Sequence, residues 1–163
     1  MDIKLKNKFL YFENYKLRCA IGKRGISSEK WEGDKKTPKG EFKFKCVLYR
    51  KDRVANLKTK LTKITINKKM GWCDDPSSIY YNKIISYPSK WNSEKLWRKE
   101  NIYDIILVIN YNLNPVIKNK GSAIFLHIAK KKYKPTNGCI AVSKKNIKII
   151  VSKINKKTKL KIY

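Results

Sequence analysis

The sequence is poor in the residues that most often bind metals. It contains one histidine, His127, and four cysteines, Cys19, Cys46, Cys73 and Cys139, with no Cys-x-x-Cys pair. A zinc site would have to recruit at least three of these cysteines, and so few cysteines in a chain of this length do not indicate a disulfide scaffold. We therefore expect neither a metal site nor a disulfide framework.

Acidic residues are scarce as well. The chain has 12 Asp and Glu against 40 Lys and Arg, a formal charge of +28 at pH 7, and only five of the cations are arginine. Such an excess favours association with an anionic cell-wall polymer or membrane surface. The abundance of Lys, Ile and Asn, whose codons are rich in A and T, offers base composition as a second explanation. Because lysine lacks the planar fork of arginine, and no RNP, zinc-finger or helix-turn-helix signature is present, we expect no specific nucleic-acid partner.

Long apolar runs are also missing. No stretch approaches the ~18 apolar residues that a membrane-spanning helix needs. The N-terminal segment lacks the apolar h-region and the small-residue cleavage site of a secretory signal peptide, so no export signal is visible in the printed sequence. Linkers, repeats and low-complexity blocks are absent too, and 163 residues fit one domain, 1–163. We expect a soluble, monomeric, single-domain protein.

The chain does contain a series of short apolar or alternating runs, which are typical of β-strands. They predict strands at Phe9–Phe12, Lys16–Ile21, Glu41–Tyr49, Lys63–Ile66, Asp104–Asn110, Ala123–Ile128 and Thr158–Ile162. The continuous Ile/Leu/Val run within 104–110 suits a central strand, because such a strand is buried on both faces.

Two helices are predicted. The first is Ser93–Lys99, with Ser93 as its cap, and the second begins at Ser143, after which isoleucines recur at helical spacing: Ile147, Ile150 and Ile154. Gly, Pro, Asn and Asp residues mark 33–40 and 130–138 as loops. The whole pattern predicts a mainly β fold with one or two helices, of the α+β class.

One segment, 121–143, carries residues suited to acyl transfer; it reads GSAIFLHIAKKKYKPTNGCIAVS. Acyl transfer needs a thiolate, a base that takes the thiol proton, and hydrogen-bond donors for the oxyanion. Cys139 and His127 could supply the first two, because a turn-forming loop separates them. Gly138 permits a tight turn before the cysteine, so that the amides of Gly138 and Cys139 could bind one oxygen.

A plainer interpretation stays open, since a lone cysteine is often a small buried residue and a lone histidine often a satisfied core residue. The pairing favours catalysis, because the only histidine precedes the only cysteine that follows a glycine. A nearby His127 imidazolium would also favour the Cys139 thiolate. Thr136 and Asn137 could brace the turn with their side chains.

The same segment resembles the L,D-transpeptidase catalytic domain, also called the YkuD domain. The hallmark of that family is a histidine on a strand, followed by a loop that ends in Ser/Thr-x-Gly-Cys, here Thr136–Cys139. Further likeness lies in Glu32-Gly33-Asp34 with Thr37-Pro38-x-Gly40, in Gly71–Asn82 and in Ser93–Asp104. The resemblance extends from about Cys19 to the C-terminus and is strongest to an uncharacterised bacterial branch.

The resemblance implies a β-rich catalytic-domain sandwich and a cofactor-free transferase of cell-wall biogenesis and cell shape. The cysteine of such an enzyme attacks the carbonyl that joins diaminopimelate to D-alanine in a peptidoglycan stem peptide, and a thioester forms as D-alanine leaves. An amine of a second stem then gives a 3→3 cross-link. By position, Cys139 corresponds to the nucleophile, His127 to the base and Gly138 to the oxyanion turn.

Three positions depart from the family pattern. Asn137 stands where many members have a histidine, Ala141 where an arginine is usual, and Ile128 where glycine is common. Since that arginine helps to hold the stem, the substrate could differ. Arg24 and Arg98 could replace that arginine as carboxylate clamps. Four polar residues after Trp72 could bind amine or amide groups of a stem peptide, or simply cap a loop: Asp74, Asp75, Tyr81 and Asn82.

Two other functions stay open from the sequence. The enzyme could be a carboxypeptidase or amidase that hydrolyses cell-wall fragments, because hydrolysis and transfer share the acyl-enzyme. The chain could instead be a non-enzymatic basic module for nucleic acid or anionic surfaces. The resemblance implies stem peptides as partners and a periplasmic or cell-envelope location. With no export signal in view, a cytoplasmic location also stays open.

Overall fold

The structure, a computed structural model, describes residues 1–163 and is mostly β with one α-helix. Its largest sheet has nine strands: β1 (Asp2–Lys6), β2 (Phe9–Phe12), β3 (Tyr15–Arg18), β6 (Gly40–Tyr49), β7 (Lys63–Thr65), β11 (Ile105–Ile109), β12 (Phe125–Ile128), β13 (Ile140–Val142) and β14 (Lys159–Ile162). The strand order is β13-β12-β11-β6-β14-β1-β2-β3, with β7 paired to β6 off this path.

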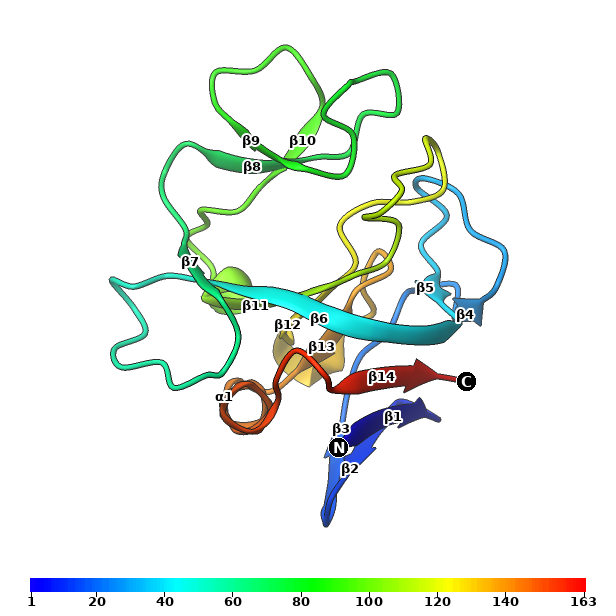
Figure 1. The fold of residues 1–163 in the computed structure, drawn as a ribbon, viewed down its shortest axis with the longest axis vertical. Helices are drawn as coiled ribbons and strands as arrows, with labels where there is room; N and C mark the ends of the chain where they lie inside the picture. Colours follow the sequence, from blue (N-terminus) through cyan, green and yellow to red (C-terminus); the bar gives the residue numbers. More distant parts are fainter.

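The remaining elements are small. A three-stranded sheet, β8 (Met70–Cys73), β9 (Ile84–Ser86) and β10 (Ser93–Lys95), lies at the top of Figure 1, away from α1 (Lys144–Lys153). Two further strands pair with each other, β4 (Ile26–Ser27) and β5 (Thr37–Pro38), and two short 3-10 helices occur, η1 (Asn101–Tyr103) and η2 (Lys131–Tyr133).

Strand β11 lies inside this architecture, as the sequence predicts, because all five of its residues are buried. Ile105, Leu107 and Ile109 belong to a core of 27 buried residues on one face of the large sheet. Ile106 and Val108 belong to a second core of 11 residues on the other face. A strand with two buried faces needs cover on both sides, so the large sheet is the middle layer of a sandwich.

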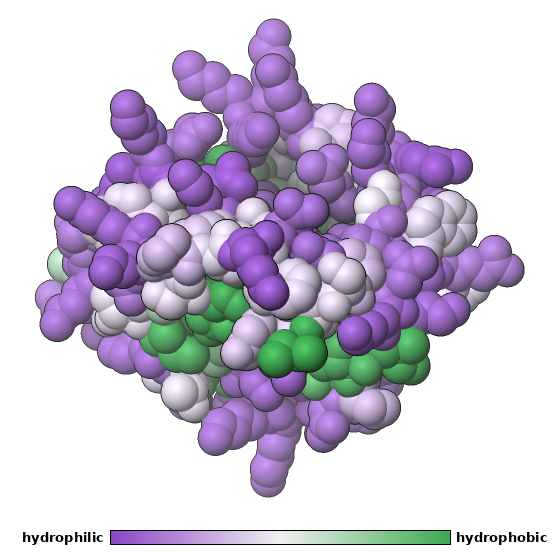
Figure 2. Space-filling view, turned by 90° about the horizontal axis from the view of Figure 1, so that it is seen from above, coloured by the Kyte–Doolittle hydropathy of each residue, from purple (hydrophilic) through white to green (hydrophobic).

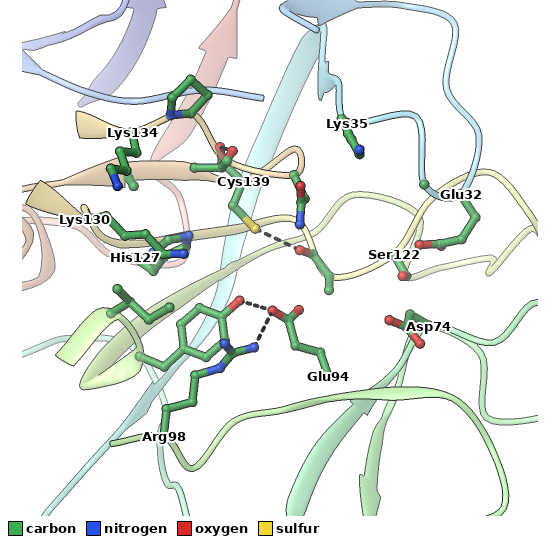
Figure 3. Close-up of a pocket in the computed structure, with 18 residues that line it drawn as sticks. Glu32, Lys35, Asp74, Glu94, Arg98, Ser122, His127, Lys130, Lys134 and Cys139 are labelled. Atoms are coloured by element: carbon green, nitrogen blue, oxygen red, sulfur yellow. Dashed lines mark hydrogen bonds and ion pairs between the residues drawn. The ribbon is translucent and has the colours of Figure 1, made fainter. Parts of the chain in front are cut away.

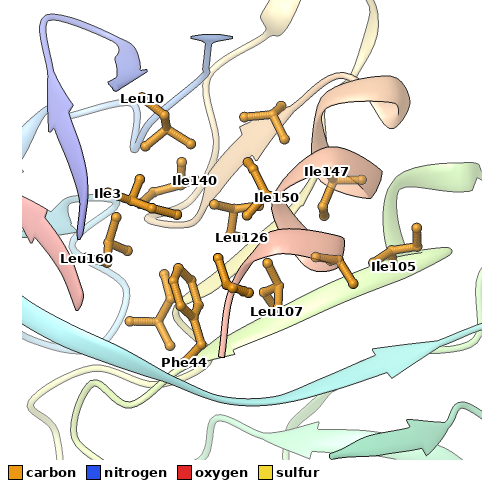
Figure 4. Packing of buried hydrophobic residues seen from close by; sticks show 14 of the residues in the cluster. Ile3, Leu10, Phe44, Ile105, Leu107, Leu126, Ile140, Ile147, Ile150 and Leu160 are labelled. Atoms are coloured by element: carbon orange, nitrogen blue, oxygen red, sulfur yellow. The ribbon is translucent and has the colours of Figure 1, made fainter. Parts of the chain in front are cut away.

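The larger core is enclosed by the curl of the sheet and by α1. Its members come from both ends of the strand order, with Ile3 and Leu10 at one end and Ile140 at the other, so the sheet curls around them. Helix α1 covers the remaining side with Ile147 and Ile150, which are fully buried (Figure 4). Truncating a side chain of this kind to alanine costs about 2–5 kcal/mol.

All seven predicted strands are present, with ends that lie within three residues of those expected. The second predicted helix is confirmed together with its cap, since the Ser143 hydroxyl accepts a hydrogen bond from the Asn146 amide at 3.2 Å. Strands β1, β4, β8, β9 and β13 were not predicted. Four of them are short and carry no strong alternation, whereas β1 does alternate, with Ile3 and Leu5 buried and the neighbouring lysines exposed.

The predicted helix Ser93–Lys99 is wrong. Its first residues form strand β10, which pairs antiparallel with β8, and the Ser93 hydroxyl lies 2.6 Å from the Tyr87 hydroxyl instead of capping a helix. The two predicted loops also contain some regular structure. Thr37–Pro38 forms β5 and Lys131–Tyr133 forms η2.

Hydrophilic residues make up most of the face seen in Figure 2, and the apolar residues visible on it gather mainly across its lower half. No helix has both the length and the apolar character needed to cross a membrane.

Candidate active site

A cavity of about 520 Å³ opens between the small sheet and the β12–β13 end of the large one (Figure 3). Three segments line it: 32–35, 74–103 and 122–141. Both Cys139 and His127 are among the lining residues. Cys139 is also the only one of the four cysteines that is partly exposed, and all four are free thiols.

The register of the sheet brings Cys139 and His127 together. Strands β12 and β13 run parallel with His127 opposite Ala141, and side chains two residues apart on a strand share a face. Cys139 therefore lies on the same face as His127. Its Sγ donates to the carbonyl of Ala123 at 3.1 Å and accepts from the amide of Phe125 at 3.4 Å.

The ring of His127 is held in one orientation. Its Nδ1 lies 2.9 Å from the carbonyl oxygen of Ile128. Because a carbonyl only accepts, Nδ1 carries the proton and Nε2 keeps its lone pair free. Tyr103 meets the imidazole edge to face at 5.2 Å between ring centroids.

Tyr103 is fixed in turn by an ion pair. Its hydroxyl donates to the carboxylate of Glu94, and Arg98 donates to the same carboxylate at 3.1 Å while its guanidinium lies 4.8 Å from the Tyr103 ring centroid. The predicted residue Arg98 thus lines the cavity, where its contacts are to Glu94 and Tyr103. These two residues were not predicted, since nothing in their local sequence separates them from ordinary polar residues.

Burial sets the protonation of the candidate pair. It raises the pKa of Cys139 to about 12, with the Glu94 carboxylate adding to the effect. It lowers the pKa of His127 to about 4, despite the bond to the Ile128 carbonyl. At neutral pH the ligand-free site therefore holds a neutral thiol and a neutral imidazole. This differs from the expected thiolate and imidazolium, because the enclosed site disfavours both charges.

The turn before Cys139 is built by Thr136 and Gly138. Gly138 has a φ of 134°, and a Cβ on it would lie 2.9 Å from the carbonyl oxygen of Lys36. The Thr136 hydroxyl accepts from the Gly138 amide at 3.1 Å and donates to the Cys139 carbonyl at 2.6 Å. The Gly138 amide, expected to be free for an oxyanion, is therefore occupied, whereas the amides of Asn137 and Cys139 make no hydrogen bond within the protein.

The residues predicted to bind substrate fall into two groups. Thr136, Asn137 and Arg98 line the cavity. The others lie outside it, namely Arg24, Asp75, Tyr81 and Asn82.

Two of the outlying residues support the cavity from behind. Tyr81 is buried, donates to Glu32 at 2.5 Å and accepts from the Gly121 amide at 3.0 Å. Asn82 is buried too, and its Oδ1 accepts from the amide of Ala123 at 3.0 Å. Since the Ala123 carbonyl receives the Cys139 thiol, Asn82 positions that acceptor.

The other two lie at the surface. Asp75 accepts from the hydroxyl of Ser77 at 2.6 Å and from the Asn92 amide at 3.3 Å, so it braces the loops beside β8. Arg24 is exposed, and its side chain makes no hydrogen bond.

Several charged cavity residues were not predicted. Glu32, Lys35, Lys130 and Lys134 line it along with Glu94. Asp74 also lines the cavity, and it belongs to the polar cluster after Trp72 that the sequence singled out. Among 40 cations a functional lysine carries no distinguishing sequence signal, whereas the scarcity of acids offered a signal for the carboxylates. No three His, Cys, Asp or Glu side chains are grouped closely enough to hold a metal ion.

Comparison with known proteins agrees with the mainly β fold. The YkuD family model, described as the L,D-transpeptidase catalytic domain, matches residues 1–162. No curated protein and no solved structure matches the chain. Because the family match extends over almost the whole chain, the protein belongs to the L,D-transpeptidase catalytic-domain family.

Proposed function

We propose that the protein is a cysteine acyltransferase that forms a thioester between Cys139 and a peptidoglycan stem peptide. Members of its family are enzymes that act on such stems. The observation that carries the proposal is the shared cavity of Cys139 and His127, in which the Ile128 carbonyl holds Nδ1 and leaves Nε2 free to accept a proton.

The first half of the reaction breaks the amide. The thiol turns from the Ala123 carbonyl and passes its proton to Nε2 of His127. The Sγ then attacks the carbonyl carbon before D-alanine, and the oxyanion accepts hydrogen bonds from the amides of Cys139 and Asn137. As the C–N bond breaks, His127 returns its proton to the leaving amine, and the acyl group remains on sulfur as a thioester.

The second half releases the acyl group. An amine of a second stem attacks the thioester carbonyl, His127 takes the proton that the amine loses, and the C–S bond breaks as the thiol is restored. This path gives a 3→3 cross-link. Water in the place of the amine gives a shortened stem, so hydrolysis is the second candidate outcome of the same acyl-enzyme.

A carbapenem tests the nucleophile directly. Its strained β-lactam carbonyl is open to thiolate attack, which breaks the ring C–N bond and leaves the whole drug attached to sulfur. We expect intact-mass spectrometry to show one added drug mass per chain, and peptide mapping to place it on Cys139. Product analysis of a stem peptide with and without an acceptor amine then separates transfer from hydrolysis.

Matched variants make the test specific. Cys139→Ala should abolish the adduct, while Cys46→Ala, which removes a buried thiol outside the cavity, should retain it. The absence of an adduct on the wild type, or an equal adduct on Cys139→Ala, would rule the proposal out.

The family is usually associated with the cell envelope, and we propose the same location for this protein. The anionic polymers of the cell envelope would attract a chain of net charge +28. A C-terminal fusion to a reporter enzyme that is active only outside the cytoplasm should give signal. Signal from a cytoplasm-only reporter alone would contradict this location.

A further inference from the structure

We infer that the candidate active site has two charged sides that orient the substrate across Cys139: Glu32, Asp74 and Ser122 take a primary ammonium, and Lys130 and Lys134 take a carboxylate. This inference rests on the proposed function and names the groups of the stem that the site would recognise.

The carboxylates of the cavity are unusual in this chain. Of only 12 Asp and Glu residues, three line the one cavity that contains Cys139: Glu32, Asp74 and Glu94. Glu94 is paired with Arg98, but neither Glu32 nor Asp74 lies within salt-bridge distance of any Lys or Arg nitrogen. With 40 cations available in the chain, these two negative charges are left open toward the cavity, where a cationic ligand would be attracted.

A second observation at the same place also indicates a ligand. The hydroxyl oxygen of Ser122 exposes less than 1 Å² and has no hydrogen-bond partner, the only such buried side-chain atom in the structure. Figure 3 shows Ser122 between Glu32 and Asp74 on one side of the hollow. Buried hydroxyls are normally satisfied, so a rotation of the half-buried Ser122 side chain toward a ligand N–H would give its oxygen the partner that it lacks in the protein.

The acceptors on this side match an ammonium in number and kind. An ammonium has three N–H donors and no acceptor. The carboxylate of Asp74 accepts no hydrogen bond from another side chain, Glu32 has one oxygen not engaged by Tyr81, and the Ser122 hydroxyl is free. Burial raises the pKa of Asp74, and a cation beside it would favour its charged form.

The opposite side of the cavity is basic. Lys130 and Lys134 lie in the loop between His127 and Cys139, line the cavity and form no ion pair with the protein. In Figure 3 they lie on the His127 side of Cys139, across from Ser122 and Asp74. Lys35 also lines the cavity and is likewise unpaired, but Figure 3 shows it above Glu32 on the acidic side, away from Lys130 and Lys134.

A stem peptide carries both charges. The diaminopimelate side chain of the donor ends in a carbon that bears a primary ammonium beside a carboxylate. The leaving D-alanine ends in a carboxylate on the other side of the bond that Cys139 would attack. The incoming acceptor stem also presents a primary ammonium. The shared chemistry is therefore an ammonium near Glu32 and Asp74, and donor and acceptor are its two sources.

The test compares stems that differ by one charge. Release of D-alanine is measured for a diaminopimelate tetrapeptide, for the same peptide acetylated on its free side-chain amine, and for the C-terminal amide. One charged hydrogen bond lost should lower kcat/KM by about tenfold for each altered peptide. Asp74→Asn should remove the discrimination against the acetylated peptide, and Lys134→Gln the discrimination against the amide.

Controls lie nearby in the chain. Glu29→Gln removes an exposed, unpaired carboxylate outside the cavity, and Lys132→Gln removes a lysine of the same loop that does not line it. Both should keep the wild-type preferences. If Asp74→Asn instead impairs only transfer to an added acceptor amine, the ammonium is that of the acceptor, which still supports the inference.

The carbapenem adduct separates the two proposals. If the adduct forms at Cys139 but D-alanine release is indifferent to acetylation and amidation, and Asp74→Asn also leaves transfer unchanged, the charged sides do not orient the substrate and this inference falls alone. If Cys139 forms no adduct, the proposed function itself fails.

Discussion

The hydroxyl of Thr37 donates a hydrogen bond to the carbonyl oxygen of Gly138 at 2.8 Å, across 101 residues of sequence. The same hydroxyl accepts from the amide of Gly22 at 2.9 Å, and Thr37 is fully buried. The Thr-Pro-x-Gly segment thus supports the turn that presents Cys139, which gives a structural reason for its place in the resemblance to the family.

Replacing Thr37 by valine should loosen this turn while preserving shape. The carbonyl of Gly138 and the amide of Gly22 would lose their partner, and we expect the free energy of unfolding to fall by about 2–4 kcal/mol. Carbapenem acylation should slow by about tenfold or more, because small displacements of a nucleophile are costly. Thr37→Ser keeps the hydroxyl and is the control. Equal losses in both variants would show that the methyl group, and not the hydrogen bond, matters.

Gly138→Ala should slow the acylation of Cys139 more than Gly25→Ala does. Its φ of 134° is unfavourable for alanine, and the added Cβ would lie 2.9 Å from the Lys36 carbonyl oxygen. We expect a loss of about 1–3 kcal/mol in stability together with strongly reduced acylation. Gly25→Ala, at a φ of 80° with open space around its Cβ, isolates the backbone effect. Normal acylation of Gly138→Ala would contradict a strict requirement for glycine in this turn.

The thiol should be unreactive at neutral pH until a substrate enters. Because burial and Glu94 raise the pKa of Cys139 to about 12, iodoacetamide alkylation of the ligand-free protein should climb toward alkaline pH without a plateau near pH 7. Glu94→Gln removes the neighbouring negative charge and should shift the profile to lower pH. Glu13→Gln, on the turn between β2 and β3, should not. A wild-type plateau between pH 5 and 8 would instead indicate a resting thiolate and imidazolium.

The strands of the large sheet were predictable where apolar residues followed one another or alternated clearly with polar ones. The Ile/Leu/Val run of β11 and the capped isoleucine pattern of α1 leave few alternatives. Ser93–Lys99 was predicted as a helix because its local signals are helical, but pairing of its first residues with β8 outweighs them. Strands as short as β4 and β5 exist only through their partners, which no local pattern reveals.

The residues of the candidate site were likewise predictable only in part. His127 and Cys139 stand out because each is rare in the sequence and they lie close together in it. Glu94, Tyr103 and Lys134 come from separate segments and have common residue types, so only the fold brings them to the cavity. Asn82, predicted to bind substrate, is instead buried behind the site, where it donates to two backbone carbonyls and accepts from the Trp72 indole at 2.9 Å.

The buried imidazole should make the protein sensitive to acid. The pKa of His127 falls from 6.5 in the unfolded chain to about 4 in the folded one, so the folded state binds the proton less well. The contribution of the neutral His127 side chain to the free energy of unfolding is therefore fully present above pH 6.5. About 3 kcal/mol of that free energy is lost as the pH falls toward 4. Urea unfolding across this range should show a steeper loss in the wild type than in His127→Gln, which cannot titrate there. Parallel curves for the two proteins would mean that His127 is charged in the folded state or exposed to water.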